Sequence, residues 1–151
     1  VSEIFSVDPD NVLLNKARRR AKLNNINLNI ESLSAEELPF ESNSFDTVVS
    51  TYTLCSIKNA EKALAEVNRV MKNGSKFIFS EHGKAPDKNV LKWQKRLNPI
   101  WSRIAGGCHL DIDIPSIISQ SKFKIPEIQS TYVPGPKFAA YHYWGYATAN
   151  K

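Results

Sequence analysis

Short apolar runs alternate with amphipathic helical patterns along the first half of the chain, and this alternation limits the folds that it can adopt. The runs that predict strands are 4–7, 26–30, 45–51 and 76–80. Between them, apolar residues recur at helical spacing after Pro9 and again from Ala60 to Met71, with Asn73-Gly74 as the expected helix end. Strands that alternate with helices of this length form βαβ units. We therefore predict an α/β fold with a doubly wound, mostly parallel sheet.

The pattern changes after the fourth predicted strand. The residues that share one helical face there are Val90, Trp93, Leu97, Trp101 and Ile104. Pro99 predicts a kink in this helix, or a new helix that starts at Asn98. A further helix is expected near 114–121, and two strands at 125–132 and 141–147 are expected to form a closing antiparallel hairpin.

Length and composition exclude several classes of protein. A chain of 151 residues suits one domain, 1–151, with a single core. Its net charge of +5 is scattered over separate basic segments, so no nucleic-acid partner is predicted. No apolar run approaches the roughly 18 residues that a membrane span needs, which leaves only peripheral membrane contact. Cys55 and Cys108 are far apart without His/Cys ligand spacing, so we expect no metal site and a reduced, cytoplasmic setting.

Polar residues follow the predicted strands at the point where each strand ends. In parallel α/β sheets, ligands bind beyond the carboxyl ends of the strands. Asp8, with Pro9 beside it, follows the first strand, and the loop 34–36 follows the second. A carboxylate there can accept both ribose hydroxyls, and a short neighbouring loop can offer a backbone N–H and an acceptor to an adenine edge. We therefore expect a nucleoside pocket with the acidic loop as one wall. The strand 45–51, which follows this loop, is expected to be buried on both faces.

Several segments of the chain carry a family resemblance. They are VDPD at 7–10, SAEELPFESNSFDTVVS at 34–50, AEKALAEVNRVMKNG at 60–74 and KFIFSEH at 76–82. In this order they resemble the class I S-adenosylmethionine-dependent methyltransferases, in the small-molecule branch that includes the ubiquinone-pathway methylases. More narrowly, TLCSIKNAEKALAEVNRV, NPIW, GGCHL and WGYA are similar to the methyltransferase-like seven group, whose members methylate alkyl thiols and sit peripherally on membranes. The resemblance implies a Rossmann-like three-layer αβα sandwich and S-adenosylmethionine as cofactor.

The same resemblance assigns roles around the adenosine of the cofactor. Asp8 would bind the ribose. Ser34 stands where many relatives have an aspartate for the adenine amino group, so that contact would be weaker or made by Glu36. Ala35 would give a backbone N–H to the adenine ring, and Leu38 would help to wall it.

The resemblance also implies a sheet order of 3-2-1-4-5-7-6. The first strand and helix of the family, with its glycine-rich loop, would precede residue 1, so the strand missing from this order is the central one, between the segments at Ile4 and Thr47. We expect either further residues upstream, or a sheet repaired by repacking or by pairing with a second copy in a homodimer. Thr51 and Tyr52 would lie near the methionine part of the cofactor and the substrate entrance.

Methyl transfer from a sulfonium is an in-line displacement, so it depends mainly on positioning and requires no catalytic dyad. A base matters only if the nucleophile arrives protonated, as a thiol does. The candidates for the catalytic role are Tyr52, His82 and His109. The two histidines also suit structural or solvated loop positions. Cys55 also faces the substrate in this scheme, but it more often acts as a small buried hydrophobic residue.

By the same resemblance, the segment 84–122 is expected to form inserted helices that cover the substrate. Its apolar residues Trp93, Leu97, Ile100 and Trp101 predict a small apolar or amphipathic acceptor with a sulfur, nitrogen or carbon nucleophile. Two alternatives remain open at this point. One is a nicotinamide-dependent oxidoreductase, because an acid after a strand also suits that ribose. The other is a non-catalytic binding domain, because the glycine loop is absent.

Overall fold

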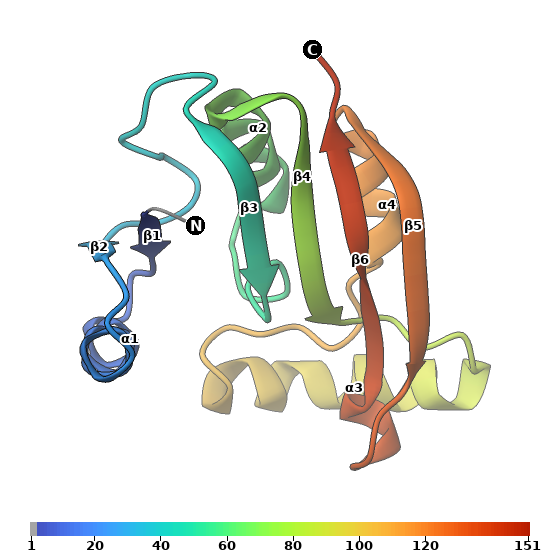
Figure 1. Cartoon of the computed structure of the whole chain (residues 1–151). Helices are drawn as coiled ribbons and strands as arrows, with labels where there is room; N and C mark the ends of the chain where they lie inside the picture. Colours follow the sequence, from blue (N-terminus) through green and yellow to red (C-terminus); the bar gives the residue numbers. More distant parts are fainter. Residues whose placement is uncertain (1–2) are drawn as a thin grey trace.

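The structure, a computed structural model, describes residues 3–151 and contains two sheets (Figure 1). The smaller sheet pairs β1 (Ile4–Val7) in parallel with β2 (Leu28–Glu31). The larger sheet joins, in this order, β3 (Phe45–Thr51), β4 (Met71–His82), β6 (Tyr141–Ala149) and β5 (Phe123–Tyr132). β3 and β4 are parallel, and β6 is antiparallel to both of its neighbours. The predicted α/β fold and closing hairpin are confirmed, and the strands follow the predicted order without its central member.

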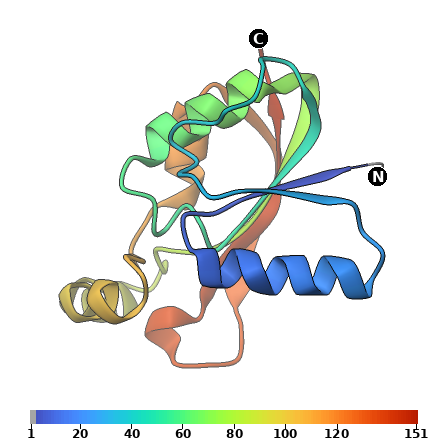
Figure 2. The same ribbon diagram turned by 90° about the vertical axis from the view of Figure 1, so that its left-hand side faces the viewer.

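The helices begin where the sequence provides caps. Asp10 precedes α1 (Asn11–Leu23), and its Oδ1 accepts the N–H of Val12 at 2.7 Å. Asn59 caps α2 (Ala60–Val70) in the same way, since its Oδ1 accepts the N–H of Lys62 at 2.9 Å. Together with α4 (Ile114–Gln120), α2 covers one face of the larger sheet, whereas α1 lies beside the smaller sheet (Figures 1 and 2).

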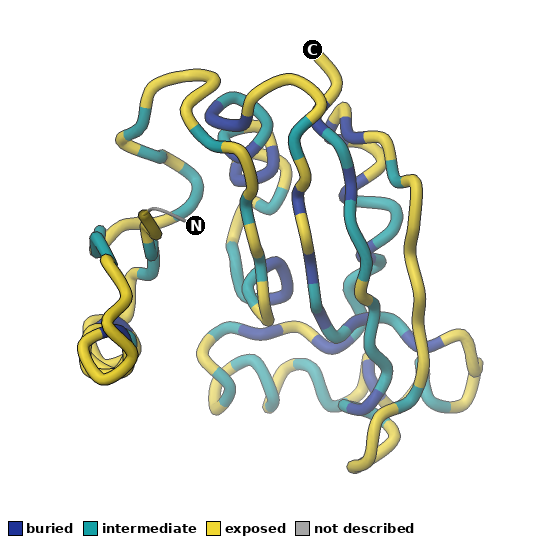
Figure 3. Tube along the Cα trace, in the orientation of Figure 1, coloured by how far each residue is buried: buried dark blue, intermediate teal, exposed yellow. Residues whose placement is uncertain are grey.

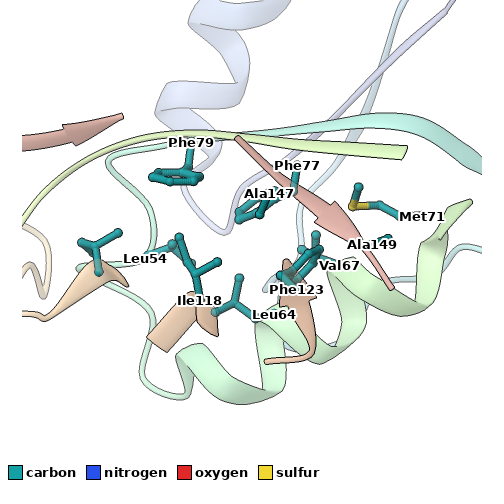
Figure 4. Close-up of a cluster of buried hydrophobic side chains, with 11 residues drawn as sticks. Leu54, Leu64, Val67, Met71, Phe77, Phe79, Ile118, Phe123, Ala147 and Ala149 are labelled. Atoms are coloured by element: carbon teal, nitrogen blue, oxygen red, sulfur yellow. The ribbon is translucent and has the colours of Figure 1, made fainter. Parts of the chain in front are cut away.

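The core lies between the larger sheet and the helices α2 and α4 (Figure 4). Phe77 and Phe79 of β4 meet Leu64 of α2 and Ile118 of α4, and none of these four side chains is more than 1% exposed. Full burial of one such side chain stabilises a fold by about 1.5–3 kcal/mol. This packing fixes the direction of β4 and therefore the position of the residues at its carboxyl end.

The second helix ends three residues earlier than predicted. It stops at Val70, and Met71 is already extended, with φ −75° and ψ 144°. The N–H groups of Asn43 and Ser44 donate to the carbonyls of Arg69 and Val70, at 3.1 and 2.8 Å, and so satisfy the helix end from a distant loop. Gly74, at φ +74°, lies instead in an irregular part of the β3–β4 pairing.

The expectation that β3 is buried on both faces is wrong. Val48 packs against the core, but the side chain of Val49 is 62% exposed. Among residues 3–151, no helix covers the face of the larger sheet opposite α2 and α4, and β3 is an edge strand there (Figure 3). An apolar run of this kind cannot by itself reveal which of its faces finds a partner.

A single helix, α3 (Lys88–Ile104), runs through Pro99 and crosses beyond the carboxyl ends of β3 and β4 (Figure 1). The alternative of a new helix from Asn98 is therefore wrong. Trp93 is 56% exposed, so it does not belong to the core, whereas Trp101 is half-buried against Phe138, with ring centroids 5.8 Å apart. Within residues 3–151, no helix combines the length and apolar character needed to cross a membrane.

Candidate active site

A groove separates β1 from β3, at the position that the predicted sheet order gives to the central strand. We call it the β1–β3 groove; its volume is about 380 Å³. Aromatic rings line its inner part, where Phe5 packs edge-to-face on Phe45 with centroids 5.5 Å apart. The residues that line it towards the strand ends are Val7, Ala35, Leu38, Ser50 and Thr53.

The groove brings the ends of β1 and β2 to one cavity, because Val7 and Ala35 both line it. Asp8, next to Val7, is half-buried, and its Oδ1 accepts the N–H of Asp10 at 2.7 Å. Pro9 is exposed. A cavity of this size with mostly apolar walls and a carboxylate beside its end fits an adenosine. The roles predicted for Asp8 and Pro9 in cofactor binding stay predictions.

The loop after β2 uses its polar side chains to hold its own shape. Ser34 Oγ accepts the N–H of Glu36 at 3.2 Å, and Glu36 Oε1 accepts the N–H of Asn59 at 3.1 Å. Of this loop, Ala35, Leu38 and Phe40 line the groove. The Glu36 carboxylate therefore connects the predicted adenine loop with the start of α2.

Tyr52 and His142 form a hydrogen-bonded pair at the carboxyl end of β3. The Tyr52 hydroxyl lies 3.0 Å from His142 Nε2, and His142 Nδ1 lies 3.1 Å from the carbonyl oxygen of Ala140. Because a carbonyl only accepts, Nδ1 carries the proton and Nε2 accepts the hydrogen bond from Tyr52. Thr51, the last residue of β3, is exposed beside them. The backbone of Tyr52 takes the left-handed conformation, with φ +52°, which turns the chain at this point.

His82 completes an aromatic cluster with this pair. Its ring centroid lies 6.1 Å from that of Tyr52 and 6.2 Å from that of His142. The structure thus brings together two of the three predicted catalytic candidates, Tyr52 and His82. No sequence motif singles out His142, which follows a turn and joins the site only because β6 pairs with β4.

His109, the third candidate, lies apart from this cluster. Its side chain is exposed, and its backbone N–H donates to the carbonyl of Cys55 at 2.8 Å. The residue therefore fastens the loop after α3 to the loop after β3.

Two cysteines lie next to His82. Cys108 Sγ is 2.8 Å from His82 Nε2 and 3.3 Å from Cys55 Sγ. The hydrogen bond between the two sulfur atoms, together with His82, lowers the pKa of Cys108 to about 5. The same hydrogen bond and burial raise the pKa of Cys55. Cys55 is indeed buried, as expected, but it contacts the sulfur of Cys108 as well as apolar side chains.

A buried carboxylate, Glu81, supports the loop that carries these groups. Its Oε1 accepts the Ser50 hydroxyl at 2.8 Å and the N–H of Thr53 at 3.1 Å. Burial raises the pKa of this carboxyl. Glu81 was not predicted as a site residue, although its position at the end of β4 is the signal that pointed to its neighbour His82.

Comparison with known families agrees with this geometry. The sequence pattern described as "Methyltransferase domain" matches residues 1–79, more than half of the 151 residues. The chain belongs to this methyltransferase family. The predicted membership of the class I S-adenosylmethionine-dependent methyltransferases is confirmed, and the cofactor of this family is S-adenosylmethionine.

Curated relatives of this methyltransferase chain include enzymes of two kinds. The thiol S-methyltransferase TMT1B of Rattus norvegicus is 39% identical over 94 residues, which are 62% of this chain and 38% of that protein. The human thiol S-methyltransferase TMT1A is 35% identical over 106 residues, 69% and 43% of the two chains. The ubiquinone/menaquinone biosynthesis C-methyltransferase UbiE of Brucella canis is 32% identical over 134 residues, 85% and 49%. The chain thus spans less than half the length of these relatives.

Solved structures with the same fold include methyltransferases of several kinds. A structure described as a putative methyltransferase from Bacillus halodurans superposes with a TM-score of 0.81 at 12% identity, covering 99% of this chain and 84% of the other. A geranyl diphosphate methyltransferase in complex with SAM gives a TM-score of 0.74 at 12% identity, covering 97% and 68%. These matches confirm the Rossmann-like fold.

Proposed function

We propose that this protein transfers the methyl group of S-adenosylmethionine to the thiol of a small apolar or amphipathic molecule. The observation that carries the proposal is the Tyr52–His142 pair beside His82, at the carboxyl end of β3, the strand that forms one wall of the β1–β3 groove. A thiol must lose its proton to become a good nucleophile, and this cluster offers an acceptor for it. The thiol S-methyltransferases among the relatives support the choice of sulfur as the nucleophile.

The cofactor would lie in the part of the β1–β3 groove nearest the strand ends. In this arrangement Asp8 binds the ribose hydroxyls, the backbone N–H of Ala35 binds the adenine edge, and Leu38 packs on the ring. Thr51 and Tyr52 then face the methionine part. S-adenosylmethionine, when bound, supplies a methyl group already activated on a sulfonium sulfur.

The chain's own residues move the acceptor's proton. Tyr52 receives it on its hydroxyl oxygen while its own proton passes to Nε2 of His142, 3.0 Å away. The positive charge that forms on His142 is stabilised by the Ala140 carbonyl, which accepts from Nδ1. Alignment of the acceptor sulfur with the methyl group then does most of the remaining work, because proximity can contribute roughly 7–11 kcal/mol.

The segment 84–122 would cover the acceptor, since α3 crosses beyond the ends of β3 and β4 (Figure 1). Its exposed residues Trp93, Ile100 and Ile104 also offer an apolar surface. They support the predicted peripheral membrane contact, on the cytoplasmic side, as part of this proposal.

Methyl transfer to an alkyl thiol, followed by mass spectrometry of the thioether, tests the function directly. Tyr52→Phe keeps the ring that faces the methionine part of the cofactor and removes only the hydroxyl, so it should lower kcat by about 10²–10⁴-fold, the usual size of a general-base contribution, and change the Kd of S-adenosylhomocysteine far less. Asp8→Ala should weaken S-adenosylhomocysteine binding in calorimetry. Methylation of a quinol but not of a thiol would contradict the thiol acceptor. It would favour instead an acceptor of the kind named for the C-methyltransferase UbiE. Binding of NADH in place of S-adenosylhomocysteine, or of neither, would overturn the proposal.

A further inference from the structure

Three side chains that are far apart in the sequence place sulfur and nitrogen atoms around one point. Cys55, His82 and Cys108 each offer one ligand atom, and these atoms all lie within 4.8 Å of one another. Both cysteines are buried, and His82 is half-buried. No other group of three histidine, cysteine or acidic side chains meets this spacing within residues 3–151. We call these residues the Cys55–His82–Cys108 cluster.

Backbone contacts hold the three ligands in place. The N–H of His109 donates to the carbonyl of Cys55 at 2.8 Å, and the N–H of Cys108 donates to the carbonyl of Ala105 at 3.1 Å. His82 is paired with His142 in the β4–β6 ladder. The cluster is therefore positioned by strands and short loops rather than by long flexible side chains, as a preorganised site requires.

The donor set selects a particular class of metal ion. Thiolate and imidazole together are the preferred ligands of Zn²⁺, and carboxylate-binding ions such as Mg²⁺ and Ca²⁺ are disfavoured. Tetrahedral zinc, with bonds of about 2.3 Å to sulfur and 2.0–2.1 Å to nitrogen, sets its donor atoms roughly 3.5–3.8 Å apart. The Cys108–His82 and Cys55–Cys108 separations of 2.8 Å and 3.3 Å are shorter, and the Cys55–His82 separation lies within 4.8 Å, so the donor atoms need to shift by about 1 Å to surround the ion.

We propose that Cys55, His82 and Cys108 bind one Zn²⁺ ion, and that the acceptor thiol occupies the fourth coordination position as a thiolate. Three protein ligands with an open fourth position are the arrangement of catalytic rather than structural zinc. The metal site depends on these residues alone, whereas the role of its fourth position depends on the thiol acceptor of the proposed function.

The reaction at this site balances without an oxidant or reductant. The thiol loses its proton through Tyr52 to His142, and its sulfur binds the metal as a thiolate. A lone pair of that sulfur then forms the new bond to the methyl carbon. The carbon–sulfur bond of the sulfonium breaks, and its electron pair stays on the cofactor sulfur. The products are a thioether and S-adenosylhomocysteine.

A disulfide between Cys55 and Cys108 is the competing use of the same sulfur atoms. A disulfide needs no histidine. In this structure, however, the atom nearest to Cys108 Sγ in the cluster is His82 Nε2, at 2.8 Å, and Cys55 Sγ is farther away, at 3.3 Å. The third donor is therefore the observation that favours a metal ion.

Metal content decides between these uses. The protein, purified under reducing conditions and titrated with Zn²⁺ alone, should bind one ion per chain. Cys55→Ser, Cys108→Ser and His82→Gln should each weaken zinc binding by more than about 100-fold, since loss of even an outer-shell partner costs about 10–100-fold. His109→Ala is the matched control, because that exposed side chain lies next to Cys108 but outside the cluster. Equal zinc binding by all four variants, or no binding by the wild type, overturns the metal site.

Cobalt reports on the fourth position. Co²⁺ bound at the site should show thiolate-to-metal charge transfer, and addition of propane-1-thiol should increase it, whereas propan-1-ol should not. No change with the thiol refutes the fourth-position role. Binding of S-adenosylhomocysteine to the zinc-free protein is measured separately by calorimetry. Failure of this binding would count against the proposed function, whereas failure of zinc binding would count against the metal site.

Protection from alkylation gives a test that needs no variant. Zn²⁺ should slow modification of Cys108 by iodoacetamide, and a chelator should restore it. Unchanged alkylation with stoichiometric zinc bound would place the ion elsewhere and refute the proposal. Recovery of a Cys55–Cys108 disulfide in mass spectra of protein that never binds zinc would identify the pair as a redox dithiol instead.

Discussion

The carboxylate of Glu66 and the guanidinium of Arg69 form a two-point ion pair on α2, with Nε to Oε1 at 2.7 Å and an Nη to Oε2 at 2.8 Å. The pair also holds the wall of the β1–β3 groove. Glu66 Oε2 accepts the N–H of Leu38 at 2.9 Å, and Arg69 donates to the carbonyls of Leu38 and Phe40. Each partner therefore fixes the other while binding the loop that lines the proposed adenine site.

Replacement of Glu66 by Gln should loosen this loop. The neutral amide can still accept the Leu38 N–H, but it loses the charge-assisted bonds to Arg69, which are typically worth about 1.5–3 kcal/mol each when buried and less at this partly exposed site. We expect the Kd of S-adenosylhomocysteine, measured by calorimetry, to rise several-fold with a small loss of stability. Glu61→Gln, on the same helix without this pairing, is the control. An unchanged Kd in Glu66→Gln would show that the loop needs no such clamp.

Acid should destabilise the fold by protonating the carboxylates of Glu66 and Asp113. Hydrogen bonds from Arg69 lower the pKa of Glu66, and the bond from Lys84 Nζ, 2.9 Å away, lowers that of Asp113. A folded pKa below the unfolded value means that this stabilisation is fully present above the unfolded pKa, near 4, and is lost as the pH falls through the folded value. Thermal unfolding should show a falling Tm below about pH 4.3. Glu66→Gln and Asp113→Asn together should flatten this slope, and an equally steep slope in the double variant contradicts the assignment.

The core offers a matched pair of leucines. Leu64 is fully buried between the larger sheet and α4, whereas Leu23 at the end of α1 is 83% exposed. Leu64→Ala should lower the free energy of unfolding by about 2–5 kcal/mol because it leaves a cavity. Leu23→Ala should change it by less than about 0.5 kcal/mol. Urea denaturation of both variants measures the difference, and similar losses in the two would place the core elsewhere.

The sequence predicted those features that depend on neighbouring residues. The run from Phe45 to Thr51 identified β3 because consecutive β-branched residues favour a strand whatever packs on it. The helical spacing after Pro9 and from Ala60 predicted α1 and α2, because residues three and four apart share one face of a helix. The resemblance then ordered these strands in a sheet.

Features that depend on distant contacts could not be predicted in this way. The end of α2 is set by N–H groups of residues 43–44, which lie on another part of the chain. His142 reaches Tyr52 only through the pairing of β4 with β6. The ligand spacing around Cys55 and Cys108 is absent from the sequence, because the donors of the cluster come from two loops and a strand end.

Gln94 connects the covering helix α3 to the strand ends and gives the last prediction. The side chain is only 1% exposed; its Oε1 accepts the N–H of Ala85 at 3.0 Å, and its Nε2 donates to the carbonyls of Gly83 and Phe138. Gln94→Leu keeps the volume but leaves these three backbone groups without their partner, and each unsatisfied buried group costs about 1–3 kcal/mol.

These contacts fasten the beginning of the segment 84–122. Their removal should therefore loosen this part of the chain locally as well as lower the stability of the whole fold. We expect faster amide exchange at Ala85 in Gln94→Leu, together with a higher KM for the acceptor and an unchanged Kd for S-adenosylhomocysteine. Gln120→Leu, an exposed glutamine at the end of α4, is the control for added apolar surface. The cofactor Kd should stay unchanged because the part of the groove assigned to adenosine lies between β1 and β3. A higher Kd of S-adenosylhomocysteine with an unchanged KM for the acceptor would contradict the prediction, since α3 would then serve the cofactor rather than the acceptor.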